Sequence, residues 1–168
     1  SKNKATKPVF FHNPLQENGY LSQWYWSPFT ISGTTYETAE KWMMHHKATH
    51  FSDTWTAAKV LSSTSPAEAK SLGRAVQNFD DASWDTVKQQ VVHQGNLYKF
   101  TISQEADALR GKLLATGERE LVEASAGDRV WGIGFREAEA ERNRRRWGGN
   151  LLGKVLMDVR RELREKEK

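Results

Sequence analysis

The chain has 168 residues, of which 38% are hydrophobic and 27% charged, with no cysteine and a net charge of +4. This length suits a single domain with its own core, and the lack of cysteine excludes disulfides, thiolate catalysis and thiolate-bound zinc. No apolar run reaches the roughly 20 residues of a membrane span, and polar residues 1–7 lack the apolar centre of a signal peptide. We therefore expect a soluble protein of the cytoplasm or nucleus, without a membrane partner.

The positive charge is concentrated near the C-terminal end. Residues 1–135 carry 14 Lys and Arg against 14 Asp and Glu, whereas residues 136–168 carry 11 against 7. A basic region on an otherwise neutral chain predicts an anionic ligand or partner. A solvated, charge-rich terminal helix is the alternative interpretation.

The first predicted elements follow a segment, residues 1–8, that we expect to be disordered, and residues 9–168 are expected to form one domain. An ordered stretch begins at Val9. Alternating apolar and polar residues over 28–36, around Ser32-Gly33, predict a β-hairpin. Thr38 can cap a helix that runs to about His50. A capping box with proline at its first helical position, residues 65–68, opens a helix whose apolar spacing continues to residue 79.

The second half of the chain is also mainly helical. A helix starting near residues 81–83 carries apolar residues at 84, 87, 91 and 98, and Gly95 within it predicts either a break or a close packing contact. A short helix opens at Ser103 and ends at Thr116-Gly117, and residues 120–124 alternate like a strand. A final amphipathic helix starts at Asn150. The predicted fold class is mainly α (α+β): a compact helical domain with a small β-hairpin.

An acid and an amine share one face of the predicted helix 38–50. Glu40 and Lys47 are seven residues apart, so they differ by about 20° around the helix and by about 10 Å along it. Met43 and Met44 lie between them, and this set can line a pocket for a sugar and a flat ring. A solvent-facing pair is the alternative, but with Trp42 beside the methionines we expect the helix to be largely buried.

Three histidines lie on the same predicted helix. His46 and His50 are spaced i, i+4, as in zinc-binding helices, but Lys47 follows His46 and no carboxylate lies between the histidines. Together with His45, we interpret them as packing or surface residues. We predict no metal site.

Residues 127–134 form a glycine-rich turn with a carboxylate, Asp128, and an indole, Trp131, three residues apart. Glycine lets the backbone approach a ligand closely, and indole offers a stacking surface for a base. A buried tryptophan in a tight loop is the alternative. The third glycine and the strand–turn–helix context of a dinucleotide fingerprint are missing, so we exclude a Rossmann site.

The arginines of residues 142–146 precede a Trp-Gly-Gly turn and a helix start at Asn150. Arginine side chains and exposed helix N–H groups both favour phosphate. A basic surface loop explains the same pattern equally well.

The order of these motifs is more specific than any one of them. In sequence they read Gln23-Trp24-Tyr25-Trp26, Glu40-Lys41-Trp42-Met43-Met44-His45-His46-Lys47, Gly73-Arg74, Trp84-Asp85, Gly95-Asn96-Leu97-Tyr98-Lys99-Phe100, Leu121-Val122-Glu123, Asp128-Arg129-Val130-Trp131-Gly132-Ile133-Gly134 and Trp147-Gly148-Gly149-Asn150. This series resembles the NADAR family of YbiA-like or RibX-like domains over about residues 9–164. One departure is that many bacterial relatives read Asn-Phe-Tyr where this chain has Gln23-Trp24-Tyr25, followed by Trp26.

The resemblance implies a YbiA-like fold and hydrolysis of an N-glycosidic bond without a cofactor. It implies roles for Glu40, Lys47 and Asp128 in catalysis. The residues expected to bind substrate are Trp84, Trp131, Met43, Met44, Asn96, Arg144 and Arg145. Either carboxylate can stabilise positive charge on the anomeric carbon. Lys47 can protonate the leaving group or form a Schiff base with ring-opened ribose; both roles need a pKa below that of ordinary lysine.

Three functions follow from this resemblance. The first is removal of ADP-ribose from ADP-ribosylated guanine in nucleic acid, which the basic region and the many indoles favour. The second is cleavage of phosphorylated ribosylamino-pyrimidine intermediates of riboflavin biosynthesis, for which the arginines would be dispensable. The third is a non-catalytic module that binds ADP-ribose. Extra carboxylates bring little benefit to a pure binder of anions, which favours an enzyme.

Overall fold

The computed structural model describes residues 6–168, and its fold is mainly helical with two small sheets, as predicted. The chain clusters into two compact units. The central unit is Trp26–Asp107, and the terminal unit combines the chain up to Tyr25 with Ala108–Lys168. One domain over residues 9–168 stays a prediction. The expected disorder of residues 1–8 falls mostly on residues 1–5, which lie outside the described residues.

The predicted hairpin of the central unit is present. Strands β2 (Phe29–Ile31) and β3 (Thr34–Tyr36) pair antiparallel, with Phe29 opposite Tyr36. The two turn residues, Ser32 and Gly33, have φ of 50° and 83°. Two successive left-handed residues match the twist of a two-residue hairpin, which explains why Ser-Gly marks the turn.

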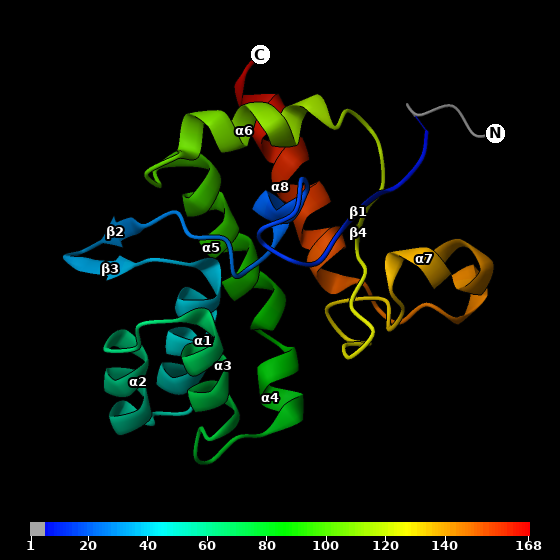
Figure 1. The fold of residues 1–168 in the computed structure, drawn as a ribbon. Helices are drawn as coiled ribbons and strands as arrows, with labels where there is room; N and C mark the ends of the chain where they lie inside the picture. The colour runs from blue at the N-terminus through cyan, green and yellow to red at the C-terminus, as the bar shows by residue number, and fades with distance from the viewer. Residues whose placement is uncertain (1–5) are drawn as a thin grey trace. The chain divides into compact units, whose positions relative to one another are not determined.

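Helix α1 (Ala39–His50) begins and ends as predicted, and the Thr38 hydroxyl accepts a hydrogen bond of 3.2 Å from the Lys41 N–H. It packs against α2 (Thr54–Leu61), α3 (Pro66–Arg74) and α5 (Lys88–Thr101), and α1, α2 and α3 lie side by side in Figure 1. Helix α2 was not predicted, although Asp53 before it is a good capping residue and accepts from the Thr56 N–H. The helix has only 8 residues, so its sequence pattern is short.

The prediction for α3 is correct at its start and wrong at its end. Ser65 accepts a hydrogen bond from the Glu68 N–H, and the Glu68 carboxylate accepts one from the Thr64 N–H. The helix ends at Arg74 rather than near residue 79: Ala75 has a non-helical φ of −96° and ψ of 4°, and Asn78 in the following loop takes a left-handed φ of 63°. The apolar spacing beyond Arg74 therefore belongs to a loop.

The predicted helix from residues 81–83 onward is two helices, α4 (Asp81–Asp85) and α5. The Thr86 hydroxyl donates to the Ser83 carbonyl at 2.6 Å, and Val87 has a φ of −124°, so the chain turns between them. At Gly95, by contrast, α5 continues. A Cβ there would lie 2.5 Å from Cδ1 of Trp42, so this glycine allows the Trp42 indole to pack directly on the α5 backbone.

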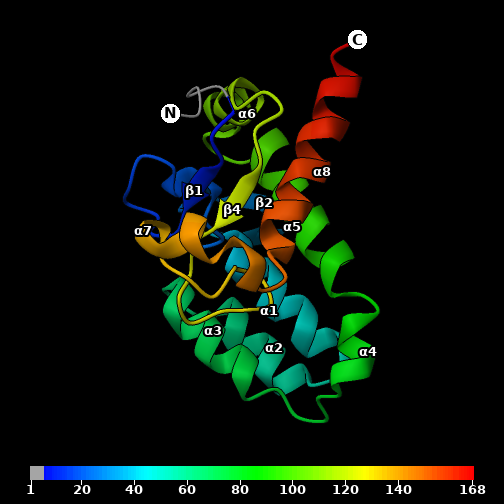
Figure 2. The same cartoon turned by 90° about the vertical axis from the view of Figure 1, so that its right-hand side faces the viewer.

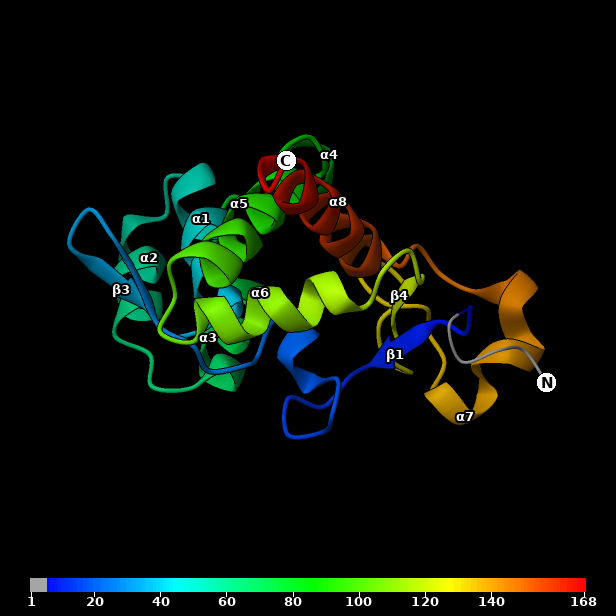
Figure 3. The same cartoon turned by 90° about the horizontal axis from the view of Figure 1, so that it is seen from above.

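The terminal unit contains the second sheet. Strand β1 (Val9–Phe11) pairs in parallel with β4 (Leu121–Glu123), the strand expected near residues 120–124 (Figure 3). Its other elements are the short helices η1 (Gly19–Leu21), α7 (Glu137–Ala140) and η2 (Glu141–Arg146), most of α6 (Ala106–Ala115), and the terminal helix α8 (Leu151–Lys166). Phe10, Val122 and Ile133 are in its core.

Helix α8 packs on β4 (Figure 2) and starts where predicted. Asn150, before the helix, has a left-handed φ of 48°. Its Oδ1 accepts from the Glu123 N–H at 3.0 Å, and its Nδ2 donates to the Leu121 carbonyl at 3.0 Å. This side chain therefore extends the hydrogen bonding of β4 and fixes the start of α8. None of the helices within residues 6–168 is long and apolar enough to cross a membrane.

Candidate functional site

Helix α1 holds the acid and the amine in a largely buried position, as predicted. Glu40 is 7% exposed, and Lys47 is half-buried. Burial lowers the pKa of Lys47 below that of an ordinary lysine, and the Arg74 charge lowers it further. The carboxylates of Glu40 and Asp81 act in the opposite direction and favour the ammonium form. The solvent-facing pair considered above is therefore wrong for this helix.

An aromatic cluster in the central unit surrounds the end of α1. The Lys47 Nζ lies 4.5 Å from the centroid of the Phe79 ring, and Phe79 meets the Phe51 ring edge to face at 5.3 Å. The His50 ring lies 4.7 Å from that of Phe51 and 6.0 Å from that of Trp84. The structure thus brings Trp84, a predicted binding residue, into the same cluster as Lys47, with its side chain buried.

Met43, Met44 and Asn96 are buried in the central unit. The Met44 sulfur fills the space beside Gly73 of α3, where a Cβ would approach it to 1.9 Å. Asn96 is fully buried, and its Nδ2 donates to the Val92 carbonyl at 2.9 Å. Met44 thus packs between α1 and α3, and contact of these three residues with a substrate stays a prediction.

The histidines of α1 have partners within the protein. The His45 Nδ1 lies 2.8 Å from the Tyr36 hydroxyl, and the His50 Nε2 lies 2.9 Å from the Ser83 hydroxyl. His46 stacks on Trp42, and its Nδ1 must carry the proton because its neighbour at 2.8 Å is the Trp42 carbonyl. Within residues 6–168, no group of three or more His, Asp or Glu side chains is placed to hold a metal ion.

In the terminal unit, Asp128 organises the glycine-rich turn. Its Oδ1 accepts hydrogen bonds from the N–H groups of Val130 and Trp131, at 2.9 and 2.8 Å. This arrangement fixes the carboxylate against the backbone of Val130 and Trp131, and Asp128 and Trp131 are both half-buried. Asp128 therefore has a structural role in its turn through Oδ1, and its role in catalysis stays a prediction.

The turn and the start of α8 are joined by backbone hydrogen bonds. Five consecutive N–H groups, those of residues 148–152, donate to backbone carbonyls of the glycine-rich turn at 2.8 to 3.2 Å. Their acceptors are, in the same order, Ile133, Arg129, Gly132, Val130 and Trp131. The helix start consequently has its first N–H groups bonded within the protein. The turn that precedes these groups in sequence folds back to supply their acceptors, which weakens the case for the helix N–H groups as phosphate ligands.

The arginines of η2 are exposed, but they are not equivalent. Arg144 pairs with Glu120 at 2.7 Å and lies over the Trp147 ring at 4.3 Å, and Arg142 pairs with Glu139 at 3.5 Å. Arg146 lies 5.7 Å from the Phe135 ring. Among the described residues, Arg145 has no ion-pair or hydrogen-bond partner. Of the two arginines predicted to bind phosphate, Arg145 is the one left available.

Two features of the central unit were missed at the sequence level. Lys99, quoted above only as part of a motif, is 1% exposed, and burial lowers the pKa of Lys99 to about 7. The sequence also did not indicate that the surroundings of Lys47 include Phe79, Arg74 and Asp81. The Gly73-Arg74 motif was a sequence signal that Arg74 belongs to the site. The contact of Phe79 with Lys47 depends on the geometry of the loop, and no sequence signal indicates it.

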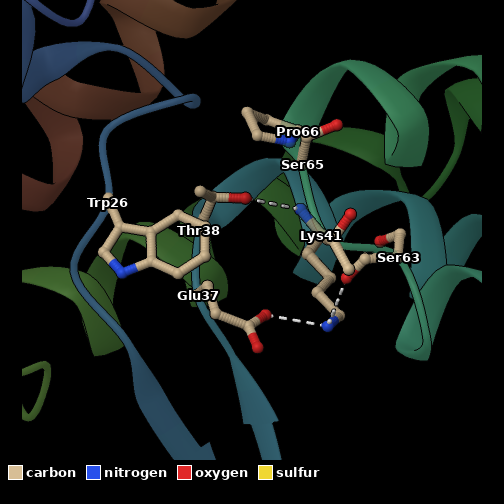
Figure 4. A pocket seen from close by; sticks show the side chains of 8 residues that line it. Trp26, Glu37, Thr38, Lys41, Ser63, Ser65 and Pro66 are labelled. Carbon is tan, nitrogen blue, oxygen red and sulfur yellow. Dashed lines mark hydrogen bonds and ion pairs between the residues drawn. The ribbon is translucent and has the colours of Figure 1, made fainter.

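A small pocket lies elsewhere in the central unit, and Figure 4 shows the side chains around it. It is lined by Trp26, Glu37, Thr38, Lys41, Ser63, Thr64, Ser65 and Pro66. The Lys41 ammonium donates to the Glu37 carboxylate at 2.8 Å and to the Ser63 carbonyl at 3.3 Å. The two charged groups of this pocket, on Lys41 and Glu37, are thus paired with each other. None of the predicted site residues lines the pocket.

Comparison with known proteins shows the family and the fold. A family model described as the NADAR domain matches residues 9–164. The chain belongs to the NADAR family. The solution structure of YbiA from Escherichia coli resembles this NADAR domain with a TM-score of 0.74 and 27% identity, over 96% of this chain and 87% of that one. The YbiA-like fold predicted from the sequence is therefore confirmed.

Three relatives of this NADAR domain have names that bear on its activity. An N-glycosidase of Acanthamoeba polyphaga mimivirus is 40% identical over 95% of this chain and 98% of its own length. N-glycosidase YbiA of Escherichia coli is 30% identical over 92% of this chain and 88% of its own length. A riboflavin biosynthesis protein of Vibrio vulnificus is 32% identical over 97% of this chain, which spans 40% of that protein. These names support N-glycosidic bond hydrolysis as the activity class.

Proposed function

We propose that this NADAR domain is an N-glycosidase that removes ADP-ribose from ADP-ribosylated guanine in nucleic acid. The observation that carries the proposal is the pair of ionisable groups on α1: a half-buried amine with a lowered pKa and a buried carboxylate on the same helix. For an amine to take part in acid–base chemistry at neutral pH, its pKa must be lowered in this way.

The chemistry of this pair suits cleavage at an anomeric carbon. As the bond from C1 of the ribose to the base nitrogen breaks, its electron pair goes to the base and positive charge develops on the sugar. The Lys47 ammonium can supply the proton that the base needs, and water then adds to C1. In the alternative route the neutral amine attacks C1 and is later released by water.

The carboxylate that stabilises the sugar is Glu40 or Asp128. Glu40 lies in a buried environment, where a charge interacts more strongly than in water. Asp128 is held by two backbone N–H groups, which leaves it well oriented but already engaged. We favour Glu40 as the essential carboxylate, and comparison of Glu40→Gln with Asp128→Asn tests this choice.

Available positive charge supports ADP-ribose as part of the substrate. Arg145 is exposed without a protein partner among the described residues, and a guanidinium group pairs well with phosphate oxygens. The half-buried Trp131 offers a surface on which a base or ribose can stack. The partner that we propose is therefore a nucleic acid that carries ADP-ribose on guanine.

A second candidate function is cleavage of phosphorylated ribosylamino-pyrimidines. The name of the Vibrio vulnificus relative favours it. Such a substrate has one phosphate group, so turnover should be insensitive to Arg145→Ala.

The test is incubation of the protein with an oligonucleotide that carries ADP-ribosylated guanine. We expect release of ADP-ribose, with loss of turnover in Glu40→Gln and Lys47→Met. No release at high protein concentration would reject the proposal. Release of ribose 5-phosphate from the pyrimidine substrate instead would establish the second candidate. Binding of ADP-ribose without turnover of either substrate would indicate a non-catalytic module.

A further inference from the structure

Phe79 lies in the loop between α3 and α4, close to the amine of α1. The Lys47 Nζ is 4.5 Å from the centroid of its ring, within the range of a cation–π contact. The ring is 41% exposed and contacts both Lys47 and Phe51.

The loop holds Phe79 in place without help from Lys47. The ring meets Phe51, at the end of α1, edge to face at 5.3 Å. Asn78 takes a left-handed φ of 63°, which sets the direction of the chain immediately before Phe79. One residue earlier, the Gln77 N–H donates to Oδ2 of Asp53 at 2.9 Å, and Asp53 also caps α2. The ring is therefore a preformed surface beside the amine.

The charges that face Lys47 come from three helices. Glu40 of α1 and Asp81 of α4 favour its ammonium form, whereas Arg74 of α3 and burial disfavour it. A lysine side chain is long and flexible, so two carboxylates from different helices do not by themselves define one position for the ammonium. The electron-rich face of Phe79 adds a third attractive group with a fixed location.

We propose that Phe79 is a positioning residue for Lys47, whose ring holds the ammonium group at one place on α1 ready to protonate the leaving base. This inference rests on the proposed function, since it concerns the group that would act in that reaction. The ring attracts the charged form and has little attraction for the neutral amine. It therefore favours the role of Lys47 as an acid over its role as a nucleophile.

The experiment that tests the contact needs no substrate. Titration of Lys47, followed by NMR after reductive ¹³C-methylation of the lysines, is compared between wild type and Phe79→Leu. We expect a lower pKa for Lys47 in Phe79→Leu, because loss of a cation–π contact changes the balance of ammonium and amine by about two- to fivefold. Phe79→Met gives the same test with a different apolar side chain, and Phe79→Trp should restore the wild-type titration.

A matched control is available on α2. The Lys59 Nζ lies 3.6 Å from the ring centroid of Trp55, which is 67% exposed. Trp55→Leu removes a contact of the same kind outside the site, and should leave the titration of Lys47 unchanged. An unchanged pKa of Lys47 in both Phe79→Leu and Phe79→Met would overturn the proposal.

Kinetics then separate this inference from the proposed function. With the ADP-ribosylated oligonucleotide, Phe79→Leu should lower kcat about two- to fivefold at pH values above the pKa of Lys47 and leave KM nearly unchanged, because the ring acts through Lys47. A rise in KM at constant kcat would show that Phe79 binds substrate itself and would overturn the proposal. If the wild type releases no ADP-ribose while the pKa of Lys47 depends on Phe79, the contact stands and the proposed function fails.

Discussion

Charged residues are largely buried in helix α1 and exposed in the arginine segment η2. In α1, Glu40 and Lys41 are buried and Lys47 is half-buried, whereas no residue of η2 is buried. Burial lowers the pKa of the Lys47 amine, because charge is less stable away from water. In η2, Arg144 and Arg142 are ion-paired at the surface, and Arg145 stays available for electrostatic contact. In the function that we propose, α1 supplies groups for reaction and η2 supplies charge for binding.

The largest expected effect concerns the amine of α1. Lys47→Met should lower kcat by about 10²- to 10⁴-fold, the usual contribution of a positioned acid or base. Lys59→Met, on the exposed face of α2, is the matched control and should retain wild-type kcat. Steady-state release of ADP-ribose measures both. Equal activity in the two variants would contradict the assignment of chemistry to α1.

A second buried amine, that of Lys99 in α5, should affect the stability of the protein. Burial lowers the pKa of Lys99 to about 7 in the folded protein, whereas an unfolded lysine keeps a pKa near 10.4. Between these values the unfolded chain binds more protons than the folded one, so the free energy of unfolding should rise as pH increases from 7 to 10. The total rise is on the order of a few kcal/mol.

Urea unfolding at several pH values measures this slope. Lys99→Met should remove it, because the variant has no group whose pKa changes at this position on folding. Lys59→Met, which removes an exposed lysine, should keep the slope of the wild type. A wild-type stability that is constant over this pH range would contradict the prediction.

Two glycines test how tightly the surroundings of α1 are packed. A Cβ on Gly95 of α5 would lie 2.5 Å from Trp42 of α1, whereas a Cβ on Gly111 of α6 would meet nothing within 4 Å. Gly95→Ala should therefore cost about 1–3 kcal/mol through overpacking. Gly111→Ala should stabilise the protein by up to about 1 kcal/mol, because alanine favours a helix. Thermal unfolding of both variants checks the opposite signs, and a higher Tm for Gly95→Ala would show that Trp42 can move aside.

The smallest effect is expected in η2. Arg145→Ala should weaken binding of ADP-ribose by about fivefold, or about 1 kcal/mol, because an exposed ionic contact is strongly screened. Arg161→Ala removes an exposed arginine of α8 that pairs with Asp158 and should leave binding unchanged. Calorimetry at low and high salt measures the difference, which should shrink as salt increases. Equal affinities of the two variants at low salt would remove the proposed role of Arg145.

Local sequence was sufficient for much of the fold. The hairpin at Ser32-Gly33, the Thr38 cap of α1 and the start of α8 depend on residues within a few positions of one another. Where local signals failed, a short element was involved. Helix α2 has only 8 residues, and the break between α4 and α5 depends on a hydroxyl that bonds three residues back.

The sequence by itself determined the family, the fold class and the two chemical groups of α1, because motif order and helix spacing are local or linear properties. Only the tertiary structure decided that the Lys47 ammonium lies over Phe79, that Lys99 is fully buried, that Glu120 pairs with Arg144, and that the first N–H groups of α8 bond to the turn near Trp131. Each of these depends on segments that meet by folding. Burial and hydrogen-bond acceptors then decide which charged or polar group is free to react or bind.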